Sequence, residues 1–114
     1  MDNMCTVIAY FYAKPEKRQE LENILQNFVV QTRQEPGCID YHLHQGENDP
    51  NVFVFYENWR SRVDWDLHNQ KPFLKSFLDK RTDYLTRDIE LKTYTMRSAY
   101  DKAGHKPNNE VERS

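Results

Sequence analysis

The sequence contains few of the residues on which disulfide scaffolds, zinc sites and phosphate-binding loops depend. Only two cysteines, Cys5 and Cys38, occur in 114 residues, and they fit none of the usual zinc spacings. Two cysteines are too few for a disulfide scaffold, so we interpret both as free thiols in a reducing cytoplasm. The chain has three glycines, and it contains no glycine-rich phosphate loop, nucleophile elbow or Rossmann fingerprint.

The sequence also lacks a strong charge of one sign and a long apolar run. Sixteen basic and eighteen acidic side chains give a formal net charge of -2. Because no block of Lys and Arg stands out, nucleic acid is not an expected partner. The apolar runs are too short to span a membrane, and residues 1–5 lack the layout of a signal peptide. We therefore expect a cytoplasmic protein with no membrane partner.

Aromatic residues, in contrast, are abundant, with six Phe, seven Tyr and two Trp. A chain of this length can form one domain with a single core, and rings must supply much of its buried apolar surface. We expect this domain to cover residues 1–98. From Ala99 the sequence becomes polar and loses its periodicity, so residues 99–114 are predicted to form a tail that is mobile or reaches a neighbouring subunit.

Hydrophobic periodicity predicts an α+β domain. Alternating or unbroken apolar residues indicate strands over residues 5–14, 38–45, 52–59 and 89–96. Apolar residues at steps of three and four indicate helices over residues 15–34, over residues 61–69 and after Pro72, the last with Leu85 on its apolar face. This order of strands and helices is the split-βαβ or ferredoxin-like arrangement.

The helices of such a domain cover only one face of the sheet. Both faces of the first and third predicted strands are apolar or aromatic, so a single copy would expose a larger apolar patch than monomers normally do. We therefore expect a homodimer in which two sheets pack face to face.

Candidate functional groups gather where the third predicted strand meets the next helix. Ser61 is an N-cap type of residue, and Asp64 follows it in a pattern close to a capping box. The groups near this corner are the carboxylate of Glu57, the amide of Asn58, the indole of Trp59 and the imidazole of His68. We therefore expect the chemistry of the protein at this corner.

A set of short motifs occurs in a characteristic order along the chain. These motifs are Lys14-Pro15 before a helix, Gln34-Glu35-Pro36-Gly37-Cys38, a Tyr in the next strand, Tyr56-Glu57-x-Trp59, and His68 followed by Pro72-Phe73. Over residues 7–96 the chain resembles the antibiotic biosynthesis monooxygenase family, which includes small bacterial quinol monooxygenases. The resemblance implies a dimeric α+β barrel with a pocket between sheet and helices, and oxidation of phenols or hydroquinones by O₂ without metal, flavin or haem.

Relatives of that family offer other functions. Autoinducer-2 phosphate isomerases share the Glu, His and Pro pattern but perform no oxygen chemistry, and a member that only binds a small ligand is a further alternative. The haem-degrading branch needs an Asn in the first strand and a His further along the second helical segment. Here the first strand has Ile8, Ala9 and Tyr10, and Lys75 stands ten residues past Trp65, so haem degradation is not expected.

His68, Trp59 and Glu57 are the predicted catalytic residues. A neutral imidazole can take a phenolic or α-carbon proton near neutral pH, although His68 could simply cap or pack the short helix. Trp59 could stack on a flat substrate or direct its N–H at an oxyanion, or it could be a core residue. Glu57 lies among rings and therefore needs a partner or a raised pKa, which makes it a candidate orienter of His68, a second acid, or half of a salt bridge.

The predicted walls of the pocket are mainly aromatic. Phe53 and Phe55 share a strand face with Glu57, whereas Tyr41 either lines the pocket or packs on the long helix. The full predicted substrate-binding set is Phe53, Phe55, Tyr41, Phe73 and Asn58. Strict alternation along the strand turns Asn58 to the opposite face unless the strand bulges.

The second predicted strand carries possible metal ligands on one face, namely Cys38, Asp40, His42 and His44. Residues two apart on a strand are separated by about 6.6 Å, so at most two neighbours could share an ion without a ligand from elsewhere. We identify no third ligand and predict no metal site. The face is interpreted as a polar surface or as part of the pocket or dimer wall.

The sequence thus predicts a cofactor-independent monooxygenase that oxidises a small hydroquinone-type aromatic with O₂. The alternatives are an isomerase that uses the same base on a carbonyl substrate, and a module that binds a small ligand without catalysis. Pocket shape depends on tertiary contacts, so the substrate itself is not predicted.

Overall fold

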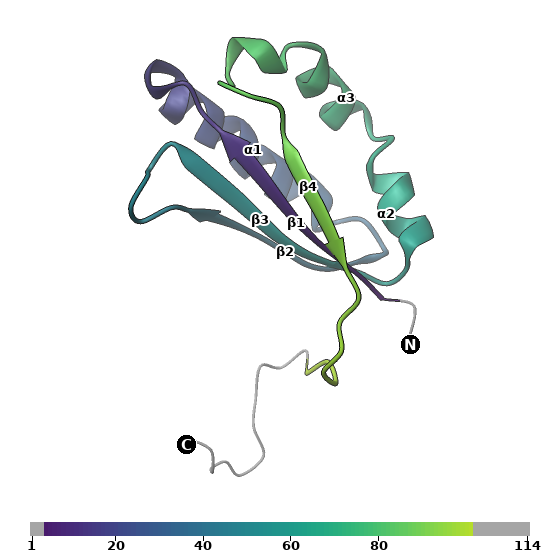
Figure 1. The fold of residues 1–114 in the computed structure, drawn as a ribbon. Helices are drawn as coiled ribbons and strands as arrows, with labels where there is room; N and C mark the ends of the chain where they lie inside the picture. Colours follow the sequence, from purple (N-terminus) through teal and green to yellow (C-terminus); the bar gives the residue numbers. More distant parts are fainter. Residues whose placement is uncertain (1–3, 102–114) are drawn as a thin grey trace.

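A computed structural model describes residues 4–101 of the chain (Figure 1). The elements in order are β1 (Cys5–Tyr12), the 3-10 turn η1 (Pro15–Lys17), α1 (Arg18–Thr32), β2 (Cys38–Gln45), β3 (Val52–Trp59), α2 (Arg62–His68), α3 (Pro72–Asp79), the 3-10 turn η2 (Arg81–Asp83) and β4 (Glu90–Tyr94). The strands form one antiparallel sheet in the order β2-β3-β1-β4. The predicted ferredoxin-like α+β fold is therefore confirmed.

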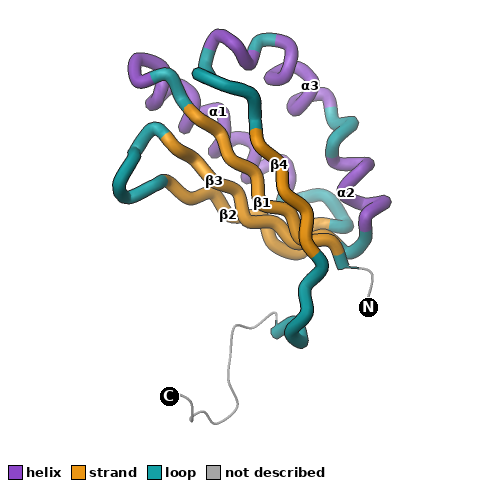
Figure 2. The backbone as a smooth tube through the Cα atoms, viewed as in Figure 1, coloured by secondary structure: helices purple, strands orange, loops and turns teal. Residues whose placement is uncertain are grey.

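The core lies between one face of the sheet and the helices, which Figures 1 and 2 show on the same side of the sheet. Alternate residues of β1 point into this core, among them Val7 and Phe11, which are 0% and 5% exposed. Leu21 and Leu25 of α1 meet them from the helical layer and are fully buried. None of the helices in residues 4–101 is long and apolar enough to cross a membrane.

Several predicted boundaries differ from the structure. The predicted long helix over residues 15–34 is a 3-10 turn followed by α1, and the last strand covers Glu90–Tyr94 rather than residues 89–96. The first strand ends at Tyr12, and Ala13 forms only an isolated bridge with Leu85. The helix that begins at Pro72 ends at Asp79 and gives way to η2. Leu85 therefore does not belong to the apolar face of that helix, as periodicity suggested. It is buried in the core because the chain folds back and pairs beside the end of β1.

The predicted grouping of side chains on the second strand is also wrong in part. The register between β2 and β3 shifts between Cys38 and Asp40. Because of this irregularity, Cys38 packs against the core, on the side of the sheet that also carries Tyr41 and Leu43. Cys38 thus does not share a face with His42 and its polar neighbours, and residues 4–101 contain no group of three or more side chains suited to hold a metal ion.

Within residues 4–101 no helix covers the second face of the sheet, which is called the open face. It is lined by Ile8, Tyr10, Tyr12, Val52, Val54 and Tyr56, with Tyr56 the most exposed of them at 36%. Residues after β4 return to this side, where the Tyr100 hydroxyl donates a hydrogen bond of 2.7 Å to Asp40 Oδ2. The rest of the predicted tail, residues 102–114, lies outside the described residues.

Candidate active site

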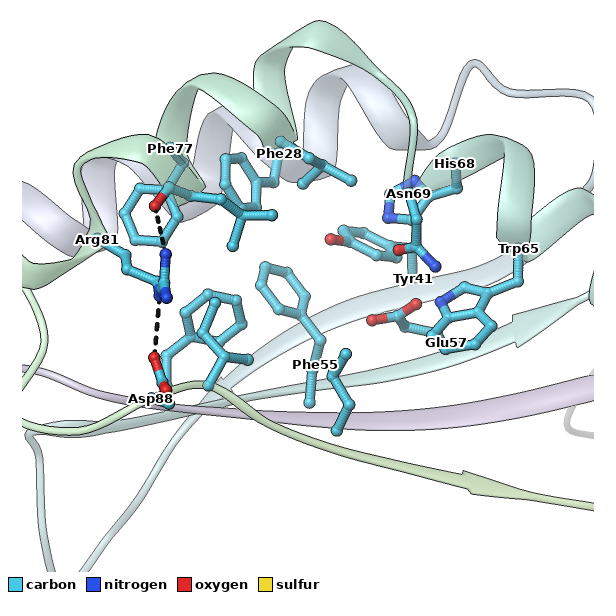
Figure 3. A pocket seen from close by; sticks show the side chains of 16 residues that line it. Phe28, Tyr41, Phe55, Glu57, Trp65, His68, Asn69, Phe77, Arg81 and Asp88 are labelled. Carbon is cyan, nitrogen blue, oxygen red and sulfur yellow. Dashed lines mark hydrogen bonds and ion pairs between the residues drawn. The ribbon is translucent and has the colours of Figure 1, made fainter.

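A cavity of about 470 Å³ lies between the sheet and the helices (Figure 3). Rings from several elements form its walls, so most of the surface that a ligand would meet is apolar. Polar groups enter from α2, from β3 and from the segment that leads into β4. Its lining includes Phe28, Tyr41, Phe55, Glu57, Trp65, His68, Asn69, Arg81 and Asp88.

The local sequence fixes the start of α2 against the sheet. Ser61 caps the helix, because its hydroxyl accepts a hydrogen bond from the Asp64 backbone N–H at 3.2 Å and donates to Asp64 Oδ2 at 2.7 Å. Gly37 lies directly beneath this turn, where a Cβ atom would come within 2.4 Å of the Asp64 side chain. The predicted cap is confirmed, and the glycine permits a close approach that directs Trp65 and His68 inward from the same helical face.

His68 is paired with the carboxylate of Glu35, which lies in the segment that ends the long helix. Its Nδ1 lies 3.0 Å from Glu35 Oε2, and the two side chains are 4% and 9% exposed. Because the carboxylate accepts, Nδ1 carries the proton and Nε2 keeps its lone pair. Burial lowers the pKa of His68, and Glu35 opposes that shift. The imidazole is therefore a neutral base near pH 7 with a fixed tautomer.

Glu57 occupies the sheet side of the same cavity and is 3% exposed. Its Oε1 accepts a hydrogen bond of 2.9 Å from Trp59 Nε1. Burial raises the pKa of Glu57 to about 7, with Trp59 acting against the shift and Glu35 adding to it. A substantial fraction of Glu57 is therefore protonated near neutral pH and can donate a proton inside the cavity.

These contacts change the roles expected for two predicted catalytic residues. The carboxylate that orients His68 is Glu35 and not Glu57. Trp59 directs its N–H at Glu57 rather than at an open position for an oxyanion. The Trp59 ring packs on the His68 ring, with centroids 4.6 Å apart. Trp59 is fully buried and supports the two ionisable residues from behind the cavity wall.

Of the five predicted substrate-binding residues, two line the cavity and two others lie outside its lining. Phe55 and Tyr41 line the cavity and stack with centroids 4.6 Å apart. Phe53 and Phe73 lie outside its lining, Phe53 within the core and Phe73 against Phe28 and His68.

Asn58 lies on the open face and does not line the cavity, so the structure does not bring it together with Phe55 and Tyr41. Its amide donates to Asp40 Oδ2 at 3.0 Å and to the Tyr56 hydroxyl at 2.9 Å, and it accepts from the Thr6 hydroxyl. Asn58 points to this face because the register of β3 with β1 is unbroken, so successive side chains of β3 alternate strictly between the two faces of the sheet.

Several cavity residues were not predicted from the sequence. Trp65 precedes His68 by three helical positions, a spacing that places both on one helix face and could have identified it. Asn69 follows His68 directly and points into the same space in Figure 3. Arg81 and Asp88 stand at the other end of the cavity, in a segment without regular periodicity, and no local pattern marks them.

Comparisons with known proteins agree with the fold. A family model described as antibiotic biosynthesis monooxygenase matches residues 4–80. The Synechocystis protein sll1783 is 37% identical over 93 residues, which are 82% of this chain but only 63% of that protein, so the chain spans less than two thirds of this relative.

Two further relatives match over most of their own length. YcnE from Bacillus subtilis, which its name describes provisionally as a monooxygenase, is 30% identical over 88 residues, covering 77% of this chain and 93% of YcnE. The structure of Rv0793 from Mycobacterium tuberculosis superposes with a TM-score of 0.80 at 26% identity, covering 86% of this chain and 99% of Rv0793. From the matched family model and these relatives, the chain belongs to the antibiotic biosynthesis monooxygenase family.

Proposed function

We propose that the protein is a cofactor-independent monooxygenase that oxidises a small phenolic or hydroquinone-type aromatic with O₂. The observation that carries this proposal is the buried His68–Glu35 pair at the edge of a ring-lined cavity. A neutral imidazole with Nε2 unprotonated can remove a phenolic proton, and Glu35 stabilises the imidazolium that forms. Membership of the monooxygenase family supports the oxygen chemistry.

Each step of the proposed reaction has a residue or a reactant that supplies it. His68 takes the phenolic proton, and the resulting phenolate transfers one electron to O₂. The ring radical and superoxide combine into a carbon-bound peroxide. Loss of the proton from that ring carbon breaks the O–O bond, leaving one oxygen as a quinone carbonyl and releasing the other as hydroxide. Glu57, in its protonated form, converts the hydroxide to water, so the substrate supplies all the electrons.

The remaining cavity residues would contribute orientation and exclusion of water. Phe55 and Tyr41 form a stacked pair that fits a flat ring. Because the walls are apolar, the phenolate and the charges near it interact more strongly than they would in water. This environment suits a reaction whose main demand is a stabilised, electron-rich anion held next to O₂.

Oxygen consumption by the purified protein tests the proposal directly. We expect enzyme-dependent uptake with at least one member of a panel of hydroquinones and polyphenols, and a loss of about a hundredfold or more in His68→Ala, as for other general bases. Asn27→Ala, an exposed position on α1, serves as the control. An absence of uptake with the whole panel, or full activity in His68→Ala, would count against an oxygenase.

A second candidate is an isomerase that acts on a small carbonyl compound. One observation favours it: a neutral base, His68, and an acid of raised pKa, Glu57, line the same cavity. Such a pair can remove a proton next to a carbonyl and return one elsewhere. Product formation in strictly anaerobic buffer distinguishes this reaction from the oxygenase. A ligand that stabilises the protein and is recovered unchanged would instead indicate a binding module.

A further inference from the structure

We propose that Arg81 selects substrates that carry a carboxylate at the end remote from the reacting hydroxyl group. This inference rests on the proposed function, because it concerns the same cavity. Arg81 and Asp88 line that cavity together with His68 and Glu57. Figure 3 shows the Arg81–Asp88 pair at one end and the His68 and Glu57 side chains at the other, with aromatic rings between them. The cavity therefore has two polar ends and an apolar middle.

The guanidinium of Arg81 is held in place by two hydrogen bonds. Nη1 donates to the Leu78 carbonyl at 2.7 Å, which ties the group to the end of α3. Nε donates to Asp88 Oδ1 at 2.9 Å. Neither bond uses Nη2, so donor capacity remains on a group whose position is already fixed. A preorganised guanidinium fork is the side chain best suited to bind a carboxylate through two parallel hydrogen bonds.

Asp88 is a weakly held partner for this guanidinium. Its side chain is 80% exposed, whereas that of Arg81 is 39% exposed. Ion pairs between such exposed groups contribute little to stability. A ligand carboxylate in the cavity can accept charge-assisted hydrogen bonds from the Arg81 N–H groups that the bonds to Asp88 and Leu78 do not use. Asp88 thus keeps Arg81 oriented in the free protein. When an acidic ligand binds, the hydrogen bond between Arg81 and Asp88 gives way to the bonds with the ligand.

The shape of the cavity narrows the class of ligand further. A volume of about 470 Å³ is at the small end of ligand pockets. It accommodates an aromatic ring that carries a side arm. The expected substrate class is a hydroquinone or phenol whose ring lies near His68 and whose short alkyl arm ends in a carboxylate at Arg81. Cationic aromatics are disfavoured by the same guanidinium.

Anaerobic titration calorimetry tests the inference without any oxidation. The ligands are 2,5-dihydroxybenzoate, 2,5-dihydroxyphenylacetate and 3-(2,5-dihydroxyphenyl)propanoate, each compared with its methyl ester. We expect at least one acid to bind about tenfold or more tightly than its ester, the ratio typical of one charge-assisted contact. Arg81→Gln should remove this preference and leave ester binding within about twofold. Asp88→Asn should strengthen acid binding.

A matched control is Arg87→Gln, because Arg87 carries the same charge nearby but packs over the Tyr12 ring with its Cζ atom 4.2 Å from the centroid. It should leave the preference for acids unchanged. The inference is overturned if acids and esters bind alike, if no acid binds, or if Arg81→Gln weakens both ligand types equally.

This experiment separates the inference from the proposed function. A preference for acids without any oxygen uptake would refute the oxidation and retain the role of Arg81. Oxygen uptake without a preference for acids would refute the role of Arg81 and retain the oxidation.

Discussion

Burial in the same cavity shifts the pKa values of His68 and Glu57 in opposite directions. Burial favours the uncharged form of both, so it lowers the pKa of the imidazole and raises that of the carboxyl group to about 7. The result near neutral pH is a base without its proton and an acid that retains one. Charged partners modify this result, because Glu35 raises the pKa of both groups.

The raised pKa of Glu57 has a measurable effect on stability. A group whose pKa rises from 4.5 to about 7 on folding binds more protons in the folded state between those values. The stability it contributes is fully present below pH 4.5 and is lost as pH rises through 7. Gln in Glu57→Gln keeps an acceptor for Trp59 but does not ionise. The folding stability of this variant should therefore not fall as pH rises through 7.

Urea unfolding at pH 4.5 and pH 8.5 provides the measurement. Between these values wild type should lose about 3 kcal/mol more than Glu57→Gln, since each pKa unit corresponds to about 1.4 kcal/mol. Glu16→Gln, at an exposed position, serves as the control. Equal pH dependence in wild type and Glu57→Gln would show that Glu57 is not perturbed.

Glu35 is a positioning residue, and its effect should be visible in the pH profile of turnover. Removal of its charge in Glu35→Gln takes away the interaction that raises the pKa of His68. The acid limb of kcat/KM should therefore move to lower pH, with a rate loss of about tenfold or more from the destabilised imidazolium. Glu35→Asp should restore part of the rate and of the profile. A rate loss without a shift of the acid limb would indicate a purely structural role.

At the scale of elements, the position of α2 depends on its contact with the start of β2. Gly37 lies under the first turn of α2, and the backbone N–H of Arg60 donates to the Gly37 carbonyl at 2.8 Å. This contact and the Glu35–His68 pair lie close together in sequence, so one bend of the chain determines both. Displacement of α2 would therefore also displace the base.

Gly37→Ala tests this coupling between helix position and cavity. The new methyl group would come within 2.4 Å of Asp64, a clash that typically costs about 1–3 kcal/mol. We expect a lower thermal midpoint and weaker ligand binding in the variant. Ser61→Ala is the matched control, since it removes the helix cap at a cost of about 1 kcal/mol without forcing the helix away. Loss of stability with unchanged ligand binding would contradict the coupling.

The sequence predicted elements and residues that depend on local signals. The order of strands and helices, the cap at Ser61 and the gathering of Glu57, Trp59 and His68 all arise within short stretches of chain. The partnership of Glu35 with His68 and the bridge of Leu85 to Ala13 join distant segments instead. Such pairs depend on tertiary packing that periodicity does not encode.

At the scale of the whole molecule, the open face presents a group of apolar and aromatic side chains. We propose that two copies associate through it, because none of the helices in the described part of the chain covers its apolar and aromatic side chains. Val54 lies at its centre, paired with Tyr10 on one side and His44 on the other. A buried charge at this position would be costly in a dimer and harmless in a monomer.

Light scattering after gel filtration tests the proposed dimer. We expect wild type to elute with the mass of two chains and Val54→Glu with the mass of one. Val30→Glu places the same charge on α1, where the side chain is already 60% exposed, and should remain dimeric. A wild-type protein of single-chain mass at tens of micromolar would refute the proposal.

The polar network around Asn58 also explains why the Glu57 side chain faces into the cavity. Thr6 and Asp40 are the residues directly across from Asn58 on the two neighbouring strands, and its amide is hydrogen-bonded to both. A slip of one residue along either strand would turn every side chain of β3 to the other side and would place Tyr56 or Asn58 where Glu57 lies. The hydrogen bonds of Asn58 therefore stabilise the register of β3, so a residue outside the cavity determines that a carboxyl group faces into it.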